Sequence, residues 1–426
     1  MALTQAAERA ALNKIIDYLD EDPEKNIDTI MTLVDKFVPE YVLPSQRLAF
    51  DTAIRERNNW YRLMMRIFDL NPEVRTKLLK TLIVDCSVLA WPYQEKMREK
   101  HQCNIPYAIL LDPTSACNLR CTGCWAAEYG HALNLSFEDI DSIICQGKEL
   151  GCHIYIYTGG EPLVRKDDLI RLCEKHQDCA FLCFTNATLI DEAFCQEMIR
   201  VGNFVPEANM DWMIEKGALF CWYFHYMPVG ASSPASLMPT PEQRERMYHF
   251  VRDMRSKKEL FTMDFQNDGE FVGGCIAGGR RYLHINAAGD VEPCVFIHYS
   301  NVNIHDVTLL EALKSPLFMK YYENQPFNDN HLRPCPMLEN PYELGRLVAE
   351  SGAHGTDLVE PETPEDLRRK TVAGAAAWAP VAEKIWNDEN DPMYTKRLEG
   401  MQQGMAETDL EKFERLGHFG DCQNEK

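Results

Sequence analysis

The sequence predicts an α/β fold in which parallel strands alternate with helices. Between residues 104 and 228, short apolar runs alternate with stretches that carry helix-capping signals. The predicted strands cover 107–112, 153–158, 179–185 and 219–227, and the predicted helices cover 136–150, 165–176 and 191–201. This alternation is typical of parallel α/β architecture. Loops rich in cysteine or glycine follow the first two strands, at the strand ends where barrel enzymes place their chemistry.

The two ends of the chain are predicted to be helical. An Asp-Pro pair at Asp22 and an Asn-Pro pair at Asn71 are typical of helix starts and predict helices over 23–38 and 73–89. Residues 1–103 are therefore expected to form a helical N-terminal domain packed on the core. The alternative is a docking surface for an apolar substrate or partner.

The C-terminal residues 346–426 are acidic and also predicted to be helical. Thr363 caps a helix in this part, and Trp378 and Trp386 are expected to dock it on the body of the protein.

Charge and length exclude several functional classes. The 44 basic and 65 acidic residues give a net charge of −21, which argues against general binding to nucleic acid or anionic lipid. No apolar run approaches the ~18 residues that a transmembrane helix needs. The start of the sequence does not resemble a signal peptide, so the 16 cysteines are expected to stay reduced in the cytoplasm.

Three cysteines in one short segment carry the strongest chemical signal. Cys117, Cys121 and Cys124 have C-x3-C-x2-C spacing and directly follow the first predicted strand. One loop can thereby place three thiolates around a single iron–sulfur cluster and leave one iron open for a small molecule. The alternatives are a structural zinc site or unreactive thiols. Zinc sites usually close with four ligands, often as paired C-x2-C units, and no such partner pair follows here.

A second motif identifies a family resemblance. Thr158-Gly159-Gly160-Glu161-Pro162 follows the second predicted strand. Together with the cysteine motif, this segment resembles the GGEP segment of radical S-adenosylmethionine (SAM) enzymes. The resemblance implies a partial TIM-type (β/α) barrel, a 4Fe–4S cluster on the three cysteines, and SAM bound to the open iron. The reduced cluster then cleaves SAM, and the 5′-deoxyadenosyl radical takes hydrogen from a substrate.

The resemblance also implies which residues would contact SAM. Thr158, Gly159, Gly160 and Glu161 would line its amino group, with Glu161 accepting a hydrogen bond from the ammonium. Thr185 and Asn186, at the end of the third predicted strand, are further candidates, although a plain turn is the alternative. The residue before the third cysteine is commonly aromatic in the family but is Gly123 here. We expect Trp125 to pack near the adenine instead.

His225 and Tyr226 are weaker candidates for catalysis. They lie at the end of the strand predicted at 219–227 and could face the substrate as proton or radical partners. An aromatic strand end is more often part of the core.

The predicted barrel, 104–230, departs from the family near residues 205–211. Between the helix at 191–201 and the strand at 219–227 only a helix fragment at 211–216 is recognisable. By family comparison a strand, a helix and a further strand are missing, and a shortened sheet would expose its edges. This observation motivates the alternative function, a non-catalytic or degenerate iron–sulfur protein for electron transfer or scaffolding.

A second cysteine set follows in residues 265–345. Gly289-Asp290 between two alternating runs predicts a hairpin that brings Cys275 and Cys294 together. This part resembles the SPASM or twitch extension of radical SAM enzymes, and Cys335 is the expected third ligand. The resemblance implies one auxiliary 4Fe–4S cluster, with either a non-cysteine ligand or an open iron at the fourth position. The remaining cysteines are expected to be small buried hydrophobes.

The expected partners follow from the resemblance. A reductant such as flavodoxin or ferredoxin would supply electrons, and an exposed cluster indicates an anaerobe. The substrate class stays open among lipids, small metabolites and peptides. No strand that would form a leader-binding module is predicted in residues 1–103, which disfavours peptides, and the long helical segment favours a bulky or lipid-like molecule. No nucleic-acid partner is expected, and no feature supports a peripheral membrane contact.

Overall fold

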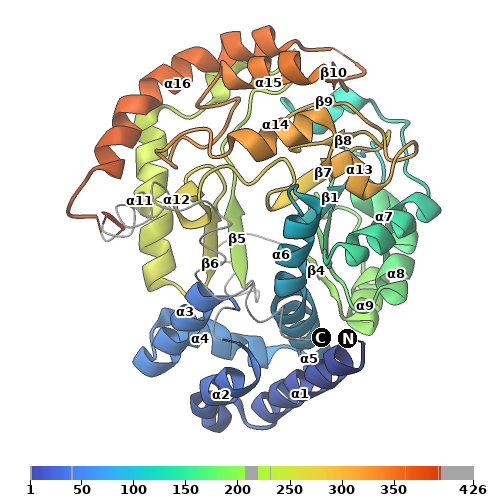
Figure 1. Cartoon of the computed structure of the whole chain (residues 1–426), viewed down its shortest axis with the longest axis vertical. Helices are drawn as coiled ribbons and strands as arrows, with labels where there is room; N and C mark the ends of the chain where they lie inside the picture. Colours follow the sequence, from blue (N-terminus) through green and yellow to red (C-terminus); the bar gives the residue numbers. More distant parts are fainter. Residues whose placement is uncertain are drawn as a thin grey trace.

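The computed structural model describes residues 2–39, 42–206, 219–230, 232–359, 361–391 and 393–394. The N-terminal helices form a layer at one end of the molecule, and the strands stand between this layer and the C-terminal helices at the other end (Figure 1). Helices α7, α8 and α9 cover one side of the strands in the same view. None of the helices in the described ranges is long and apolar enough to cross a membrane.

Seven helical segments make up the N-terminal layer. They are α1 (Ala2–Glu21), α2 (Pro23–Phe37), α3 (Pro44–Glu56), α4 (Asn59–Arg66), α5 (Pro72–Leu79), η2 (Lys80–Leu89) and α6 (Ala90–His101), with the short turn η1 (Ile67–Asp69) after α4. The side chain of Asp22 caps α2, and Asn71 caps α5, as the sequence predicted. The helix expected over 73–89 continues from α5 into η2, where the hydrogen bonding is of π-helix type.

The main sheet has six strands in the order β4-β3-β2-β1-β7-β8. The strands are β1 (Ala108–Leu111), β2 (Ile154–Tyr157), β3 (Ala180–Cys183), β4 (Phe204–Pro206), β7 (Tyr282–Ile285) and β8 (Val291–Glu292). All pair in parallel except β8, which is antiparallel to β7. Helices α7 (Phe137–Glu149), α8 (Lys166–Lys175) and α9 (Glu192–Val201) connect the parallel strands β1 to β4. The predicted mixed α/β fold, with the sheet of a partial barrel, is confirmed.

The two faces of the sheet enter different cores. Ile109, Leu111 and Phe181 lie in the core beneath α7–α9, whereas Leu110 and Ile156 belong to a second core on the other face. This division follows from the two-residue period of strands, which sends successive side chains to opposite faces. The second core is the inner side of the barrel, which the remaining strands approach.

Two further strands form a separate parallel pair. β5 (Phe220–Tyr223) pairs with β6 (Phe261–Asp264), and α11 (Pro241–Lys257) connects them after the short turn η5 (Ala235–Leu237). Trp222 and Phe265 pack from this pair into the second core. In the described ranges β4 is the outer strand of the main sheet, and β5 makes no ladder with it. The shortening expected at 205–211 falls mostly on residues from 207 on, which lie outside the described residues. The helix fragment expected at 211–216 lies outside them as well.

The hairpin predicted around Gly289 is present, and it joins the main sheet. Gly289 has φ +91°, and β7 and β8 flank the turn. β7 also pairs with β1 along its whole length, a contact that the sequence did not predict. The hairpin cysteines and the first cysteine loop are therefore attached to neighbouring strands of one sheet.

The C-terminal elements complete the cover over the hairpin. They are α12 (Gly269–Val272), β9 (Tyr299–Ser300), α13 (Leu309–Leu313), α14 (Pro316–Asn324), α15 (Glu343–Ser351), β10 (His354–Gly355) and α16 (Pro364–Trp386). Thr363 forms the predicted capping box at the start of α16. Trp378 and Trp386 lie in a small core, and the Trp378 indole donates a hydrogen bond of 2.9 Å to the carbonyl of Leu332. Both tryptophans therefore dock α16 as expected.

A buried ion pair links α11 to the segment that carries Cys335. The Arg244 guanidinium donates to the Glu339 carboxylate at 2.7 Å and to Asn267 at 2.8 Å, and it lies over the Trp378 ring. Glu339 in turn accepts a hydrogen bond from the backbone N–H of Cys335 at 2.8 Å. Burial raises the pKa of Glu339, so the carboxylate depends on Arg244 for its charge.

We predict that Arg244→Met destabilises the fold strongly, because it leaves Glu339 buried without its cation. The expected loss is about 3–5 kcal/mol in the free energy of unfolding, measured by urea denaturation at pH 7. Arg246→Met, at an exposed position of the same helix, is the matched control and should change stability by less than about 0.5 kcal/mol. Equal effects of the two substitutions would contradict the role given to the pair.

Candidate functional site

The three-cysteine motif forms an irregular loop directly after β1. Cys117 and Cys124 are half-buried, Cys121 is exposed, and none of the three is in a disulfide. The backbone N–H of Leu119 points to the Cys117 sulfur at 3.4 Å. Burial raises the pKa of Cys124, and the nearby thiols of Cys121 and Cys117 add to this effect. The loop therefore holds three unpaired thiols near one another, in part open to solvent.

Compact groups of candidate metal ligands lie elsewhere in the described residues. A single zinc with Zn–S bonds of ~2.3 Å would hold its thiolates about 3.8 Å apart. Among the described residues, ligand atoms that all approach within 4.8 Å occur in two other groups, Asp141/Cys145/His176 and His153/Asp178/Cys179. Cys117, Cys121 and Cys124 are not among these groups.

The loop after β2 lies against the segment that leads from β1 into the cysteine loop. Gly160 donates a backbone hydrogen bond of 3.0 Å to Thr114, and Glu161 donates one of 2.8 Å to Ala116. A Cβ on Gly160 would lie 2.2 Å from the carbonyl oxygen of Ala116, and one on Gly159 would lie 2.7 Å from that of Thr114. Gly159 also has φ +99°. Both glycines are therefore required for the contact between the two motif loops, which are the cysteine loop after β1 and the glycine loop after β2.

Glu161 connects the loop after β2 to the loop after β3. Its buried carboxylate accepts hydrogen bonds from the Thr185 hydroxyl at 2.7 Å, the Asn186 backbone at 2.8 Å and the Leu163 backbone at 2.9 Å. The last of these caps the short helix η4 (Pro162–Arg165). Thr185 and Asn186 thus contact Glu161. The three residues, all candidates for SAM contacts, therefore lie together. Glu161 holds strand ends together, and two oxygens with about four acceptor positions leave it room for one more donor.

The cysteine loop is tied into the same network through Asn118. The Asn186 amide donates to Asn118 at 2.9 Å, and the Asn118 amide donates to the Thr188 hydroxyl at 2.7 Å. Between these residues Ala187 has φ +62°, which is uncommon for a residue with a side chain. Asn118 was not singled out from the sequence. Its position inside the cysteine motif was the available signal.

Tyr226 reaches the cysteine loop, whereas His225 does not. A Cβ on Gly123 would lie 2.6 Å from the Tyr226 hydroxyl, so an aromatic residue at 123 would collide with this ring. The Tyr226 hydroxyl is buried and has no hydrogen-bond partner among the described residues. The His225 ring instead lies 3.7 Å from Asp264, and burial, together with the charge of Arg244, lowers its pKa to about 3. His225 is therefore neutral at pH 7, with its ring beside Asp264.

Trp125 packs inward, against a cluster of rings. It begins the short helix η3 (Trp125–Tyr129) and makes edge contacts with His284, Phe296 and His298 at ring-centroid distances of 5.8–6.3 Å. These contacts fix the end of the cysteine loop on the β7–β8 hairpin. The adenine contact expected of Trp125 stays a prediction.

Beneath these loops lies a buried polar network that the sequence did not predict. His284 on β7 lies 3.0 Å from Asp112, at the end of β1, and 2.7 Å from Glu292 on β8. The Tyr129 hydroxyl donates to Glu292 at 2.8 Å. Burial alone would lower the pKa of His284, but the two carboxylates raise it to about 10. The position of Asp112, an acidic residue directly after an apolar run, was an available signal in the sequence. Its partners could not be predicted, because they depend on the pairing of β1 with β7.

The second cysteine set also converges. Burial raises the pKa of Cys275 to about 11 and that of Cys294 to about 12. The pKa of Cys335 is raised well above its usual value by burial, with further contributions from Glu339, Cys275 and Cys294. The Tyr282 hydroxyl lies 2.7 Å from the Cys294 sulfur. Cys294 is buried, whereas Cys275 and Cys335 are half-buried. Thiols with raised pKa values stay protonated until a metal displaces the protons.

Of the other cysteines, most are buried, as expected for small apolar side chains. The buried ones are Cys86, Cys103, Cys152, Cys173, Cys179, Cys183 and Cys221. Cys145 is exposed and Cys195 half-buried, whereas Cys422 lies outside the described residues.

Comparison with known proteins gives one family and several partial relatives. Residues 111–211 match the model of the Radical SAM superfamily. An uncharacterized protein of Archaeoglobus fulgidus is 30% identical over 26% of this chain and 26% of its own length. A GTP 3′,8-cyclase of Clostridium botulinum is 30% identical over 25% of this chain and 35% of its own length. The chain thus matches about a third or less of these relatives.

A solved structure gives a looser likeness. The crystal structure of Streptococcus suis SuiB bound to S-adenosylmethionine covers 51% of this chain and 67% of its own, with 16% identity and a TM-score of 0.42.

We predict that Gly160→Ala abolishes close contact between the two motif loops. The added methyl group meets the backbone of Ala116, which cannot rotate away, so SAM binding should weaken on the order of tenfold or more. Equilibrium dialysis with the iron-reconstituted protein measures this. Gly345→Ala is the control, because its methyl group would meet only Pro364, at 3.7 Å. Unchanged SAM binding in Gly160→Ala would show that the contact does not shape the site.

Proposed function

Because residues 111–211 belong to the radical SAM superfamily, we propose that this chain is an enzyme that cleaves SAM reductively and takes hydrogen from a substrate. The observation that carries the proposal is the junction of three loops at the C-terminal ends of β1, β2 and β3. Asn118, Glu161 and Asn186 join these loops by hydrogen bonds of 2.8–2.9 Å. The junction places the thiols beside the glycine loop, as a shared site for a cluster and SAM requires.

The chain's own residues hold and orient the cofactors. Cys117, Cys121 and Cys124 would ligate a 4Fe–4S cluster, which supplies the electron for SAM cleavage when bound and reduced. The backbone of Thr158 to Gly160 would approach the SAM amino group, and the remaining acceptor position of Glu161 would face its ammonium. Thr185 and Asn186 would border the site.

Tyr226 is the residue we place nearest the reaction. Its hydroxyl touches the cysteine loop, has no hydrogen-bond partner within the described ranges, and could donate to a ligand. His225, buried and neutral next to Asp264, would support the strand end rather than transfer protons.

Cys275, Cys294 and Cys335 would hold an auxiliary 4Fe–4S cluster. The support for this assignment is their convergence around Tyr282, together with the Arg244–Glu339 pair that fixes the Cys335 backbone. Electrons would come from a flavodoxin- or ferredoxin-type donor in the cytoplasm.

We predict that the reconstituted protein forms 5′-deoxyadenosine when it is given dithionite and SAM without oxygen. The triple variant Cys117→Ala, Cys121→Ala, Cys124→Ala should lose this product, measured by liquid chromatography and mass spectrometry. Cys145→Ala, which removes another exposed thiol, is the control and should keep the product. A protein with full iron content that forms no 5′-deoxyadenosine would instead be a non-catalytic iron–sulfur protein.

Iron content gives a separate prediction for the second cysteine set. The triple variant Cys275→Ala, Cys294→Ala, Cys335→Ala should fall from about eight to about four irons per chain, because one 4Fe–4S cluster is lost. Colorimetric iron and sulfide assays measure this directly. Iron that stays at the wild-type level would exclude an auxiliary cluster at these thiols.

A further inference from the structure

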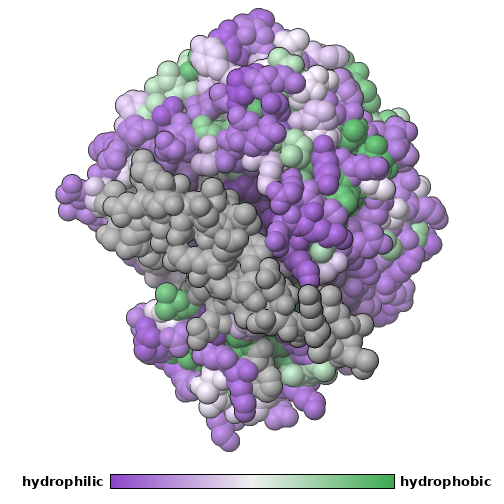
Figure 2. Space-filling view, viewed as in Figure 1, coloured by the Kyte–Doolittle hydropathy of each residue, from purple (hydrophilic) through white to green (hydrophobic). Residues whose placement is uncertain are grey.

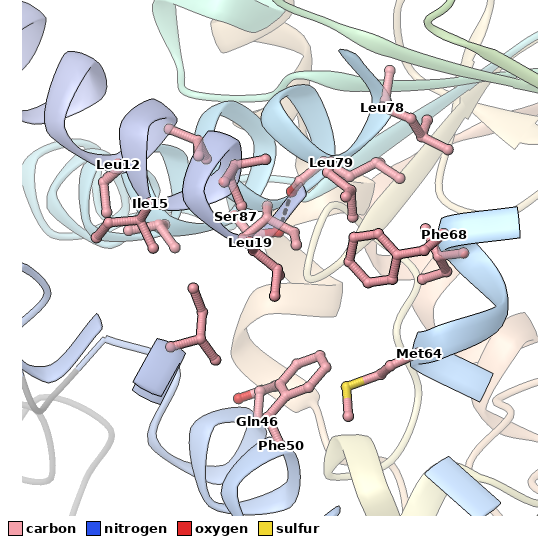
Figure 3. A pocket seen from close by; sticks show the side chains of 18 of the residues that line it. Leu12, Ile15, Leu19, Gln46, Phe50, Met64, Phe68, Leu78, Leu79 and Ser87 are labelled. Atoms are coloured by element: carbon pink, nitrogen blue, oxygen red, sulfur yellow. Dashed lines mark hydrogen bonds between the residues drawn. The ribbon is translucent and has the colours of Figure 1, made fainter. Parts of the chain in front are cut away.

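A large apolar cavity lies between the N-terminal helices and the outer part of the sheet. Its volume is about 770 Å³, and its walls come from α1 to α5, η2, α9, β3, β4 and β5. Figure 3 shows side chains of the N-terminal helices, including Leu12, Leu19, Phe50 and Phe68, pointing into one shared space. The volume is within the range of small-molecule sites, about 300–1,000 Å³.

The chemistry of the walls selects for hydrocarbon. Leucine, isoleucine, valine, methionine and phenylalanine provide nearly all of the lining, and Gln46, Arg47 and Ser87 are the polar exceptions among the described residues. Ser87 donates its hydroxyl to the carbonyl of Leu82 at 2.7 Å, and Arg47 donates to the carbonyl of Pro39 at 2.7 Å and contacts Asp35. A polar ligand would give up hydrogen bonds with water and find few replacements here.

The cavity is recessed rather than flat. Leu12, Ile16 and Ile27 line it and are nevertheless at least nine-tenths buried. A protein partner would need a surface of roughly 800 Å² on each side, reached from outside. A slender flexible molecule can enter such a space instead, and apolar cavities as small as ~150 Å³ are known to bind apolar ligands.

One wall of the cavity belongs to the barrel that carries the candidate site. Ala180 and Leu182 of β3 line the cavity and lie on the inner face of the sheet, with the second core. The site loops leave the opposite, C-terminal ends of the strands. A strand of four residues spans about 13 Å, so the wall that β3 contributes lies within roughly that distance of the loop that follows β3.

Some of the hydrophobic side chains that line the cavity are also partly open to solvent. Phe50, Ile83 and Ile199 line it and are 39–47% exposed. Figure 2 shows a mainly hydrophilic face with hydrophobic patches over the N-terminal helices, at the bottom of the view. Such side chains are unfavourable in water and stabilise an apolar ligand as it enters.

We propose that this cavity binds a long aliphatic chain, fatty acyl or isoprenyl, and that the substrate is therefore an amphiphilic lipid. The assignment of the ligand as substrate rests on the proposed function, whereas the binding of the chain does not. The lining, the volume and the inner-face wall of β3 support this class over small polar metabolites and over peptides.

The test measures binding of radiolabelled palmitate to the anaerobically reconstituted holoprotein, by equilibrium dialysis without SAM. We expect saturable binding of one palmitate per chain. Octanoate should bind at least on the order of tenfold more weakly, because each methylene that leaves water contributes about 0.8 kcal/mol. Farnesol as competitor distinguishes the two sources of the chain, since displacement of palmitate shows that isoprenyl chains are also accepted.

Two substitutions on one helix distinguish palmitate binding in the cavity from palmitate binding to the protein surface. Phe50→Asp places a charge in the lining of the cavity and should weaken palmitate binding on the order of tenfold or more. Leu48→Asp, also on α3 but outside the cavity and 66% exposed, should change binding by less than about twofold. Ile83→Asp, on η2, repeats the first test should Phe50→Asp fail to fold. Circular dichroism verifies that each variant is folded.

Several outcomes would overturn the proposal. They are absence of palmitate binding by the wild type, equal losses in Phe50→Asp and Leu48→Asp, or a dimer in sedimentation that Phe50→Asp dissociates while palmitate stays unbound. Formation of 5′-deoxyadenosine by the same preparation separates this proposal from the proposed function. If the protein cleaves SAM but does not bind palmitate, only the proposed lipid site is wrong. If it binds palmitate but does not cleave SAM, only the proposed enzyme function is wrong.

Discussion

The contact between the glycine loop after β2 and the segment after β1 is the constraint on which the site depends. Gly159 and Gly160 lie so close to residues 112–116 that no side chain fits between them. This contact sets where the cysteine loop starts, and Glu161 then fixes the loop after β3 at the same point. Three separate segments thereby act as one rigid surface, which is what a cluster and a bound cofactor require of their protein.

The pairing of β7 with β1 is the second constraint, and it has an electrostatic consequence. It brings His284 between the carboxylates of Asp112 and Glu292, in a region without solvent. Buried charges are costly unless they are paired, so the network favours this strand order over others. The same pairing places the hairpin that carries Cys294 beside the strand that leads to Cys117, so one sheet would hold both proposed clusters.

The third feature is the apolar cavity, which lies between the N-terminal helices and the strands of the barrel. The helices cover the end of the strands opposite the motif loops, and they leave space lined almost wholly by hydrocarbon. A sheet that opens to a polar site at one end and an apolar cavity at the other is suited to an amphiphilic molecule. Under the proposed lipid site, the helical segment would contribute to substrate recognition as well as to stability.

Much of the fold could be predicted from the sequence. Strand and helix alternation, the caps at Asp22, Asn71 and Thr363, and the hairpin turn at Gly289 are local signals, and each appears in the structure. The two cysteine sets and the glycine motif are likewise short patterns whose chemistry follows from residue type and spacing. The roles of individual residues near them were less accessible. His225 and Tyr226 are adjacent in sequence, yet only the tyrosine reaches the cysteine loop.

By itself, then, the sequence determined the α/β alternation and the cysteine and glycine motifs, because these depend on neighbours along the chain. Only the tertiary structure decided that β7 pairs with β1, that Glu161 clamps three loops, that Gly123 makes room for Tyr226, and that the N-terminal helices enclose a cavity. Each of these arises from side chains distant in sequence that compete for the same space. Packing of that kind has no local signature, and it appears only when the chain is folded.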